Sequence, residues 1–140
     1  MKKQKIVVAS GYFDPLHVGH IEYLEMAKNL GDKLIVIINN DEQAKLKKGS
    51  HFMSDQERAK IIKSLKPVDE VFISIDKDST VCKSLEFLKP DIFAKGGDRF
   101  SSEIPEAKVR RELNIKIIDG LGEKIQSSSW LINKAKEKIK

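Results

Sequence analysis

Two histidines follow the first apolar run of the chain at a spacing that suits phosphate chemistry. His17 and His20 stand three positions apart, in a segment that starts at Gly11 and follows the run Ile6–Ala9. Gly11 and Gly19 let the backbone approach a ligand closely. A helix that begins here offers unpaired N–H groups and a positive dipole end to an anion, and imidazole N–H groups complete such a site. The segment therefore predicts phosphate binding.

Two other interpretations of the histidine pair compete with this one. The histidines could act only as turn and helix-capping residues, which is common for one histidine but not for a pair so placed. They could also bind zinc, but no third ligand is evident, because His51 is remote and Cys82 is the sole cysteine. We favour phosphate binding and predict no metal ligands in the chain itself.

Lysines gather in a segment that we expect to be a loop. Lys45, Lys47 and Lys48 precede Gly49, after the second apolar run. Such a loop could close over a triphosphate, although three lysines in a loop are as often simply solvated. The residues do not decide which of the three contacts phosphate.

Two further segments carry groups that suit a nucleotide. Gly96 and Gly97 allow close backbone approach, and Asp98 can accept hydrogen bonds from a ribose or a base; the alternative is a tight turn capped by Asp98. A run of three hydroxyls stands where we expect the last helix to begin, at Ser127, Ser128 and Ser129. These hydroxyls can cap that helix or hold a triphosphate at its dipole-positive end.

Five short apolar runs indicate the strands that position these groups. They are continuous rather than alternating, as expected for strands that are covered on both faces. The runs are Ile6–Ala9, Leu34–Ile38, Val71–Ile75, Ile92–Ala94 and Ile115–Ile118. Helical patterns separate them, and strand–helix alternation favours a parallel α/β sheet with helices on both faces. Ligands of such sheets bind beyond the carboxyl ends of the strands, where the segments above lie.

The helix boundaries follow from local signals. An amphipathic pattern predicts a first helix that carries Ile21, Leu24, Ala27 and Leu30 on one face and ends at Gly31, a residue suited to the position past a C-cap. Ser54 and Glu57 predict the start of a second helix, which Pro67 stops. We expect three more helices, over about 79–88, over about 105–113 and from Ser127 onward.

Composition bounds the class of protein. The 140 residues fit one domain, 1–140, on a scale of about 100–200 residues per domain. A formal charge of +5 favours anionic ligands. A single cysteine excludes an internal disulfide and predicts a reducing compartment, so we expect a cytoplasmic protein without a membrane span, with Cys82 as a small core residue.

The segment Gly11–His20 resembles the cytidylyltransferase-like nucleotidyltransferase superfamily, whose signature is a glycine–aromatic–aspartate stretch followed by His-x-Gly-His. Similarity also covers the lysines before Gly49, the Lys95–Asp98 segment and the serine run, so it spans nearly the whole chain. The resemblance implies a single Rossmann-like domain with a five-stranded parallel sheet. It assigns catalysis to His17, His20, Lys48 and Lys124, and nucleotide binding to Gly11, Tyr12, Phe13, Asp14, Val18, Gly19, Lys47, Arg58, Gly96, Gly97, Asp98, Ser127, Ser128 and Ser129.

The resemblance implies transfer of a nucleoside monophosphate from a triphosphate to a phosphorylated acceptor, with Mg²⁺ carried by the substrate phosphates and no organic cofactor. Lys95–Asp98 is similar to the heptose-phosphate adenylyltransferases, so we favour ATP and a sugar phosphate as precursor of a cell-surface polysaccharide. Length and the final motif are also similar to glycerol-3-phosphate cytidylyltransferases, which use CTP. The archaeal-type FAD synthetases share Phe13-Asp14 and both histidines.

Other classes fit the sequence less well. A non-catalytic nucleotide- or RNA-binding module would leave the histidine pair unexplained, and aromatic residues make up only 6% of the chain. A hydrolase would need an activated nucleophile or an acidic metal cluster, and neither is evident. We expect no membrane or nucleic-acid partner, and the sequence leaves a homodimer open.

Overall fold

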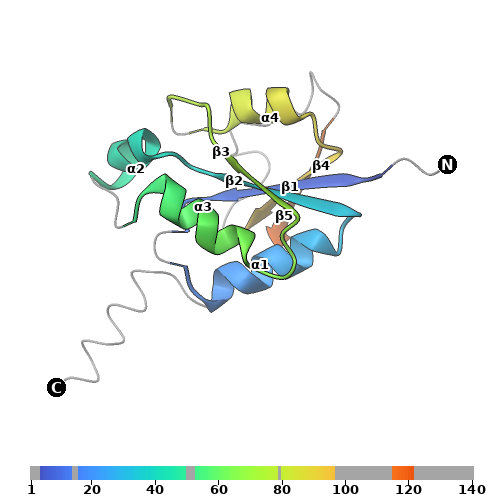
Figure 1. Cartoon of the computed structure of the whole chain (residues 1–140). Helices are drawn as coiled ribbons and strands as arrows, with labels where there is room; N and C mark the ends of the chain where they lie inside the picture. The colour runs from blue at the N-terminus through green and yellow to red at the C-terminus, as the bar shows by residue number, and fades with distance from the viewer. Residues whose placement is uncertain (1–3, 14–15, 50–52, 79, 97–114, 122–140) are drawn as a thin grey trace.

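The computed structural model describes residues 4–13, 16–49, 53–78, 80–96 and 115–121, which build a parallel sheet (Figure 1). The strands are β1 (Ile6–Gly11), β2 (Lys33–Ile38), β3 (Glu70–Ile73), β4 (Ile92–Gly96) and β5 (Lys116–Leu121). Their order in the sheet is β3-β2-β1-β4-β5, and all neighbouring pairs are parallel. The predicted five-stranded parallel sheet is therefore confirmed.

Helices cover both faces of the sheet. On one face, Val7 and Ala9 of β1 pack with residues of α1 (Val18–Lys28) and α3 (Asp55–Lys63); on the other, Val8 packs with Leu85 of α4 (Cys82–Leu88). Figure 1 shows α1 and α3 on the side of the sheet opposite to α4. Because successive strand residues point to opposite faces, a continuous apolar run is what two buried faces require.

The segment that we predicted to be a lysine loop is a helix, α2 (Asp41–Lys48). Asn40 caps its start by accepting the N–H of Gln43, while the Gln43 side chain accepts the N–H of Asn40. Gly49 ends the helix in the left-handed conformation, with a φ of 82°. Such a capping box and a left-handed glycine stabilise a short helix that has few apolar residues.

Gly31 serves a purpose other than the one we predicted. The first helix ends at Lys28 with Asn29 as its C-cap, and the left-handed glycine of the described residues is Gly49. A Cβ on Gly31 would lie 2.7 Å from a methyl carbon of Val7 and 2.8 Å from the carbonyl oxygen of Lys5. Gly31 is therefore needed for close packing against the start of β1.

The remaining helix predictions had mixed outcomes. The third predicted helix is α4, which starts at Cys82 rather than near residue 79, because the buried Asp76 carboxylate accepts the N–H groups of Lys83 and Ser84. Cys82 is half-buried at the edge of the core. The helices expected over 105–113 and from Ser127 lie outside the described residues. Within the described part of the chain, no helix has the length and apolar character needed to cross a bilayer.

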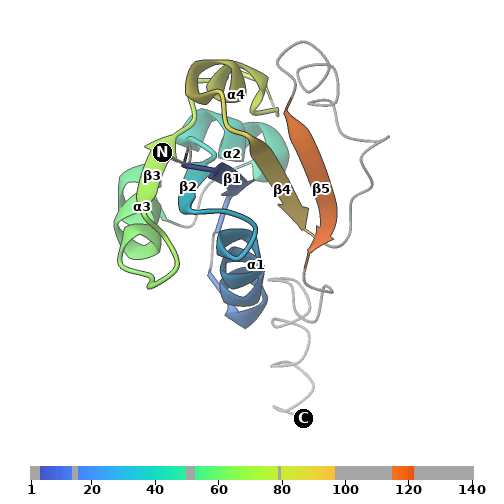
Figure 2. The ribbon, with the colours of Figure 1, turned by 90° about the vertical axis from the view of Figure 1, so that its right-hand side faces the viewer.

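The order of the strands selects one place for a ligand. From β1 the chain adds β2 and β3 on one side, and then crosses to add β4 and β5 on the other side. β1 therefore pairs with β2 on one side and with β4 on the other (Figure 2). In open parallel sheets, ligands bind outside the carboxyl ends of the strands at this switch point. The segments that follow β1, β2 and β4 are those that the sequence singled out.

Candidate active site

His17 and His20 cap the start of α1 by bonding to the backbone of their own segment. Nδ1 of His17 accepts the N–H of Gly19 at 3.2 Å, and Nδ1 of His20 accepts the N–H of His17 at 3.2 Å. The two rings stack, with centroids 3.8 Å apart and planes 24° apart. The interpretation that these histidines are capping residues is therefore correct for the Nδ1 atom of each ring.

The capping bonds determine which nitrogen of each ring carries the proton. A neutral imidazole has one donor and one acceptor nitrogen, and in both rings Nδ1 is the acceptor. The proton of each neutral ring is therefore on Nε2, which makes Nε2 a donor. Two such donors, stacked at the N-terminus of a helix, suit phosphate oxygens. Capping uses Nδ1 of each ring, so it does not exclude phosphate binding through Nε2, which stays a prediction.

Phe13 supports His20 through a strained piece of backbone. Its φ is 53°, a left-handed conformation that costs a residue with a side chain about 1–2 kcal/mol. The ring is 3% exposed and meets the His20 ring edge-on, with centroids 5.0 Å apart. A Cβ on Gly11 would lie 2.9 Å from the Phe13 ring, so a larger residue at position 11 would force the buried ring to move. The packing around Phe13 thus maintains the strain and fixes one face of His20.

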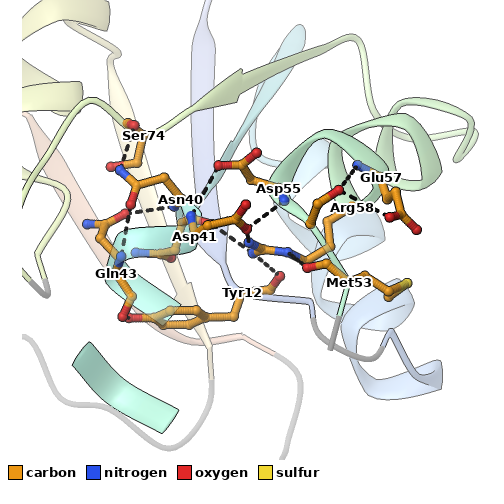
Figure 3. A network of polar contacts seen from close by, with 11 residues as sticks. Tyr12, Asn40, Asp41, Gln43, Met53, Asp55, Glu57, Arg58 and Ser74 are labelled. Carbon is orange, nitrogen blue, oxygen red and sulfur yellow. Dashed lines mark hydrogen bonds and ion pairs between the residues drawn. The ribbon is translucent and has the colours of Figure 1, made fainter. Parts of the chain in front are cut away.

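Arg58 is a buried residue that connects backbone segments, which corrects the phosphate-facing role that the resemblance implied for it. Its side chain is fully buried, and Nη1 donates to the carbonyl oxygens of Tyr12 at 2.9 Å and Asn39 at 2.7 Å. Nε donates to the carbonyl of Met53 at 3.0 Å, and Nη2 pairs with the carboxylate of Asp41 at 3.0 Å (Figure 3). The rigid fork of the guanidinium reaches several acceptors at once. Arg58 therefore joins α3 to the carboxyl ends of β1 and β2.

The start of α2 is bonded to the segment that follows β3. Nδ2 of Asn40 donates to the carbonyl oxygens of Ser74 at 3.0 Å and Asp76 at 2.9 Å. The buried Gln43 donates through Nε2 to the carbonyls of Asp78 at 2.7 Å and Thr80 at 2.8 Å. These bonds and the Arg58 pair hold the first turn of α2 in place, and Figure 3 shows the Asn40–Ser74 bond and the Arg58–Asp41 pair. The backbone of the helix that carries the three lysines is therefore held at its first turn.

The structure locates some of the predicted site residues. Val18 and Gly19 form the first turn of α1, and Gly96 ends β4, the strand that pairs with β1. Lys45 is exposed on α2. The side chains of Lys47 and Lys48 are not among those described, so the choice of lysine stays a prediction.

Other predicted site residues fall outside the described part of the chain. Their predicted roles stay predictions, and they are Asp14, Gly97, Asp98, Lys124, Ser127, Ser128 and Ser129. The last three belong to the serine run, so neither the cap nor the triphosphate site predicted for Ser128 and its neighbours is tested. Within the described ranges, no three acidic, histidine or cysteine residues gather as metal ligands, and Mg²⁺ also stays a prediction.

Sequence reasoning missed three residues that organise this site. Asn40 and Gln43 stand in the capping-box spacing, a signal that could have identified α2. Tyr23 follows His20 by three positions and so lies on the same face of the helix, and a buried tyrosine needs a partner for its hydroxyl. That partner is the carbonyl oxygen of Ala94 on β4, which has no local signal in the sequence.

Comparisons with known proteins agree with this arrangement. The chain matches the cytidylyltransferase-like family over residues 8–139. It is 43% identical over 124 residues to an FAD synthase of Thermococcus sibiricus, an alignment that covers 84% of this chain and 81% of that protein. It is 40% identical over 114 residues to the bifunctional protein HldE of Helicobacter pylori strain P12, of which it spans 24%.

A solved structure is also similar in both sequence and fold. It is the crystal structure of the lipopolysaccharide core biosynthesis protein from Thermoplasma volcanium GSS1, with a TM-score of 0.74 and 30% identity. The similarity covers 86% of this chain and 98% of that one. The Rossmann-like arrangement of the sheet and helices is therefore shared with a solved relative.

Proposed function

The chain belongs to the cytidylyltransferase-like family of nucleotidyltransferases, and we propose that it transfers the adenylyl group of ATP to the phosphate of a sugar phosphate. The observation that carries the transfer chemistry is the stacked histidine pair at the start of α1. Its Nδ1 atoms are engaged in capping, which places the proton of each neutral ring on Nε2, an N–H donor of the kind that binds phosphate. The choice of ATP and of the acceptor rests on similarity.

The reaction needs positioning and charge stabilisation more than proton transfer. An oxygen of the acceptor phosphate forms a bond to the α-phosphorus, and the bond from that phosphorus to the leaving pyrophosphate breaks. A phosphate monoester has a second pKa of about 6, so the attacking oxygen is already ionised at neutral pH. Donors that meet the growing charge on the α-phosphate then supply most of the catalysis. His17 and His20 fit this role, with Lys47, Lys48 and Lys124 as further cationic groups.

The metal that we propose is the Mg²⁺ that accompanies the triphosphate. Magnesium binds few protein ligands and is held by phosphate oxygens and water. The histidine pair supplies N–H groups and no carboxylate, which fits a metal carried by the substrate. When bound, Mg²⁺ would neutralise charge on the leaving pyrophosphate.

Two kinds of similarity favour adenylyl transfer to a sugar phosphate. Lys95–Asp98 resembles the heptose-phosphate adenylyltransferases, and the similar solved structure is described as a lipopolysaccharide core biosynthesis protein. FAD, the product that gives the FAD synthase its name, contains an adenylyl group. The 43% identity to that protein also favours a second candidate, in which the acceptor is FMN. Glycerol 3-phosphate with CTP is the third, on the resemblance of the final motif.

A panel of substrates tests the proposal. We would incubate the protein with ATP, CTP, GTP or UTP and with heptose 1-phosphate, FMN or glycerol 3-phosphate, in the presence of Mg²⁺, and measure pyrophosphate. The expected result is release that requires ATP together with heptose 1-phosphate; reactions without acceptor control for hydrolysis. Preference for CTP, or for FMN, would replace the proposed substrates and keep the family chemistry. No pyrophosphate with any pair would refute the proposed reaction for these acceptors.

A further inference from the structure

Tyr23 joins two strands through its hydroxyl group. The hydroxyl donates to the carbonyl oxygen of Ala94 in β4 at 2.5 Å and accepts the N–H of Ser10 in β1 at 3.2 Å. The side chain projects from α1 and is 8% exposed. Burial raises the pKa of Tyr23 above its ordinary value, so the group stays a neutral donor at physiological pH. The N–H of Ser10 and the carbonyl oxygen of Ala94 are thus both bonded to the same hydroxyl.

The bridge lies where β1 and β4 stop pairing. Their register runs from Val7 opposite Ile92 to Ala9 opposite Ala94, whereas β1 continues beside β2 as far as Gly11. Beyond Ala9, the phenol occupies the β4 side of β1. This is the switch point of the sheet, where the crevice for a ligand opens between neighbouring strands.

The two atoms that Tyr23 joins precede the two segments singled out for nucleotide binding. Ser10 is followed by Gly11 and the segment that leads to the histidine pair; Ala94 is followed by Lys95 and Gly96 at the end of β4. One hydroxyl therefore connects the backbone at the entrance of both segments.

We propose that Tyr23 is a positioning residue, which fixes the separation of β1 and β4 at the switch point and thereby the affinity for the nucleotide. The inference rests on the proposed use of a nucleoside triphosphate. Removal of the hydroxyl leaves the partly buried N–H of Ser10 and the buried C=O of Ala94 without this partner, a loss that the two strand ends can reduce by moving. Nucleotide binding must then return the two strand ends to the separation that they have in the parent protein. The free energy that this costs weakens the apparent affinity.

The test is the variant Tyr23→Phe, which removes one oxygen and keeps the ring. The probe is whichever of ATP and CTP the parent protein binds more tightly, so the result does not depend on the acceptor. We expect the dissociation constant to rise about tenfold, which corresponds to about 1.4 kcal/mol. With the best acceptor of the panel, KM for the triphosphate should rise alike while kcat stays within about twofold, because the histidine caps are unchanged.

Ile62→Val is the matched control. Ile62 is fully buried in α3, in the same core cluster as Tyr23, and neither hydrogen bond of the Tyr23 bridge involves it. It should lower the melting temperature and leave the dissociation constant unchanged. If Tyr23→Phe loses stability but binds the triphosphate as tightly as Ile62→Val, the hydroxyl is only structural and the inference is wrong.

Two further outcomes separate this inference from the proposed function. If the parent binds ATP or CTP but transfers it to another acceptor, the proposed function fails and the comparison of affinities still decides on Tyr23. If the parent binds neither triphosphate, both fail. Should Tyr23→Phe not fold, amide exchange of the parent decides: slow exchange at Ser10 supports the bridge, and exchange as fast as that of an unbonded surface amide overturns it.

Discussion

Replacement of Arg58 by methionine tests whether the buried guanidinium holds the strand ends together. The change keeps an unbranched side chain of similar length and removes the donors to Tyr12, Asn39 and Met53 together with the partner of Asp41. It leaves three carbonyl oxygens and one carboxylate without these donors. The structure thus predicts a large loss of stability from one substitution, with little loss of core volume.

The magnitude follows from burial on each side of the pair. Removing one partner of a buried ion pair costs about 3–5 kcal/mol. The Arg58 side chain is fully buried, but the Asp41 side chain is 32% exposed and can regain water, which favours the lower part of that range. Adding about 1–3 kcal/mol for each carbonyl would count the same relaxation more than once. We expect about 3–4 kcal/mol, which lowers the melting temperature by roughly 10–15 °C in a domain of this size.

Two companion variants sharpen the measurement, which is thermal unfolding followed by circular dichroism. Arg58→Lys keeps a charge near Asp41 but lacks the fork, so it should fall between parent and Arg58→Met. Lys60→Met removes an exposed charge from the same helix and should stay within about 0.5 kcal/mol of the parent. A melting temperature for Arg58→Met within about 3 °C of the parent would refute the idea that Arg58 holds the strand ends together. Equal losses in Arg58→Met and Lys60→Met would reduce Arg58 to a surface charge.

Two other predictions concern the histidine pair and the ion pair between Lys28 and Asp69. His17→Asn keeps a side-chain acceptor for the cap and removes the Nε2 donor, so we expect turnover to fall by on the order of two to three decades with little loss of stability; turnover near that of the parent at saturating substrate would contradict the assigned role. The Asp69 carboxylate has a lowered pKa, chiefly because Lys28 donates to it, with a further bond from the N–H of Leu34. A lowered folded pKa adds stability that is present above the unfolded value of about 3.9 and is lost as the pH falls through the folded value. Urea midpoints measured between about pH 6 and about pH 2 should therefore drop less in Asp69→Asn than in the parent, and parallel curves would show that the pair contributes nothing.

Local patterns were enough to predict the sheet and the position of the histidines. The central strands β1, β2 and β4 are apolar runs that are buried on both faces, so their identity depends only on neighbours in sequence. The start of α3 at Ser54 likewise uses a hydroxyl and an N–H three positions apart. The histidine segment was also found from spacing, since a strand followed by a helix puts its residues at a carboxyl end. The capping box of α2 follows the same rule, and its spacing would have predicted a helix in place of the lysine loop.

Only the tertiary structure decided the roles of Arg58, Tyr23 and Gly31. Arg58 bonds to carbonyls 46 and 19 positions away, and the Tyr23 hydroxyl bonds to a carbonyl 71 positions away. Carbonyl oxygens belong to every residue, so the sequence contains no side chain that could reveal these partners. Gly31 looks like a helix-ending glycine until the start of β1 is placed against it. Spacing determines bonds within a turn or a helix, whereas a buried donor finds its acceptor only after the strands have taken their order in the sheet.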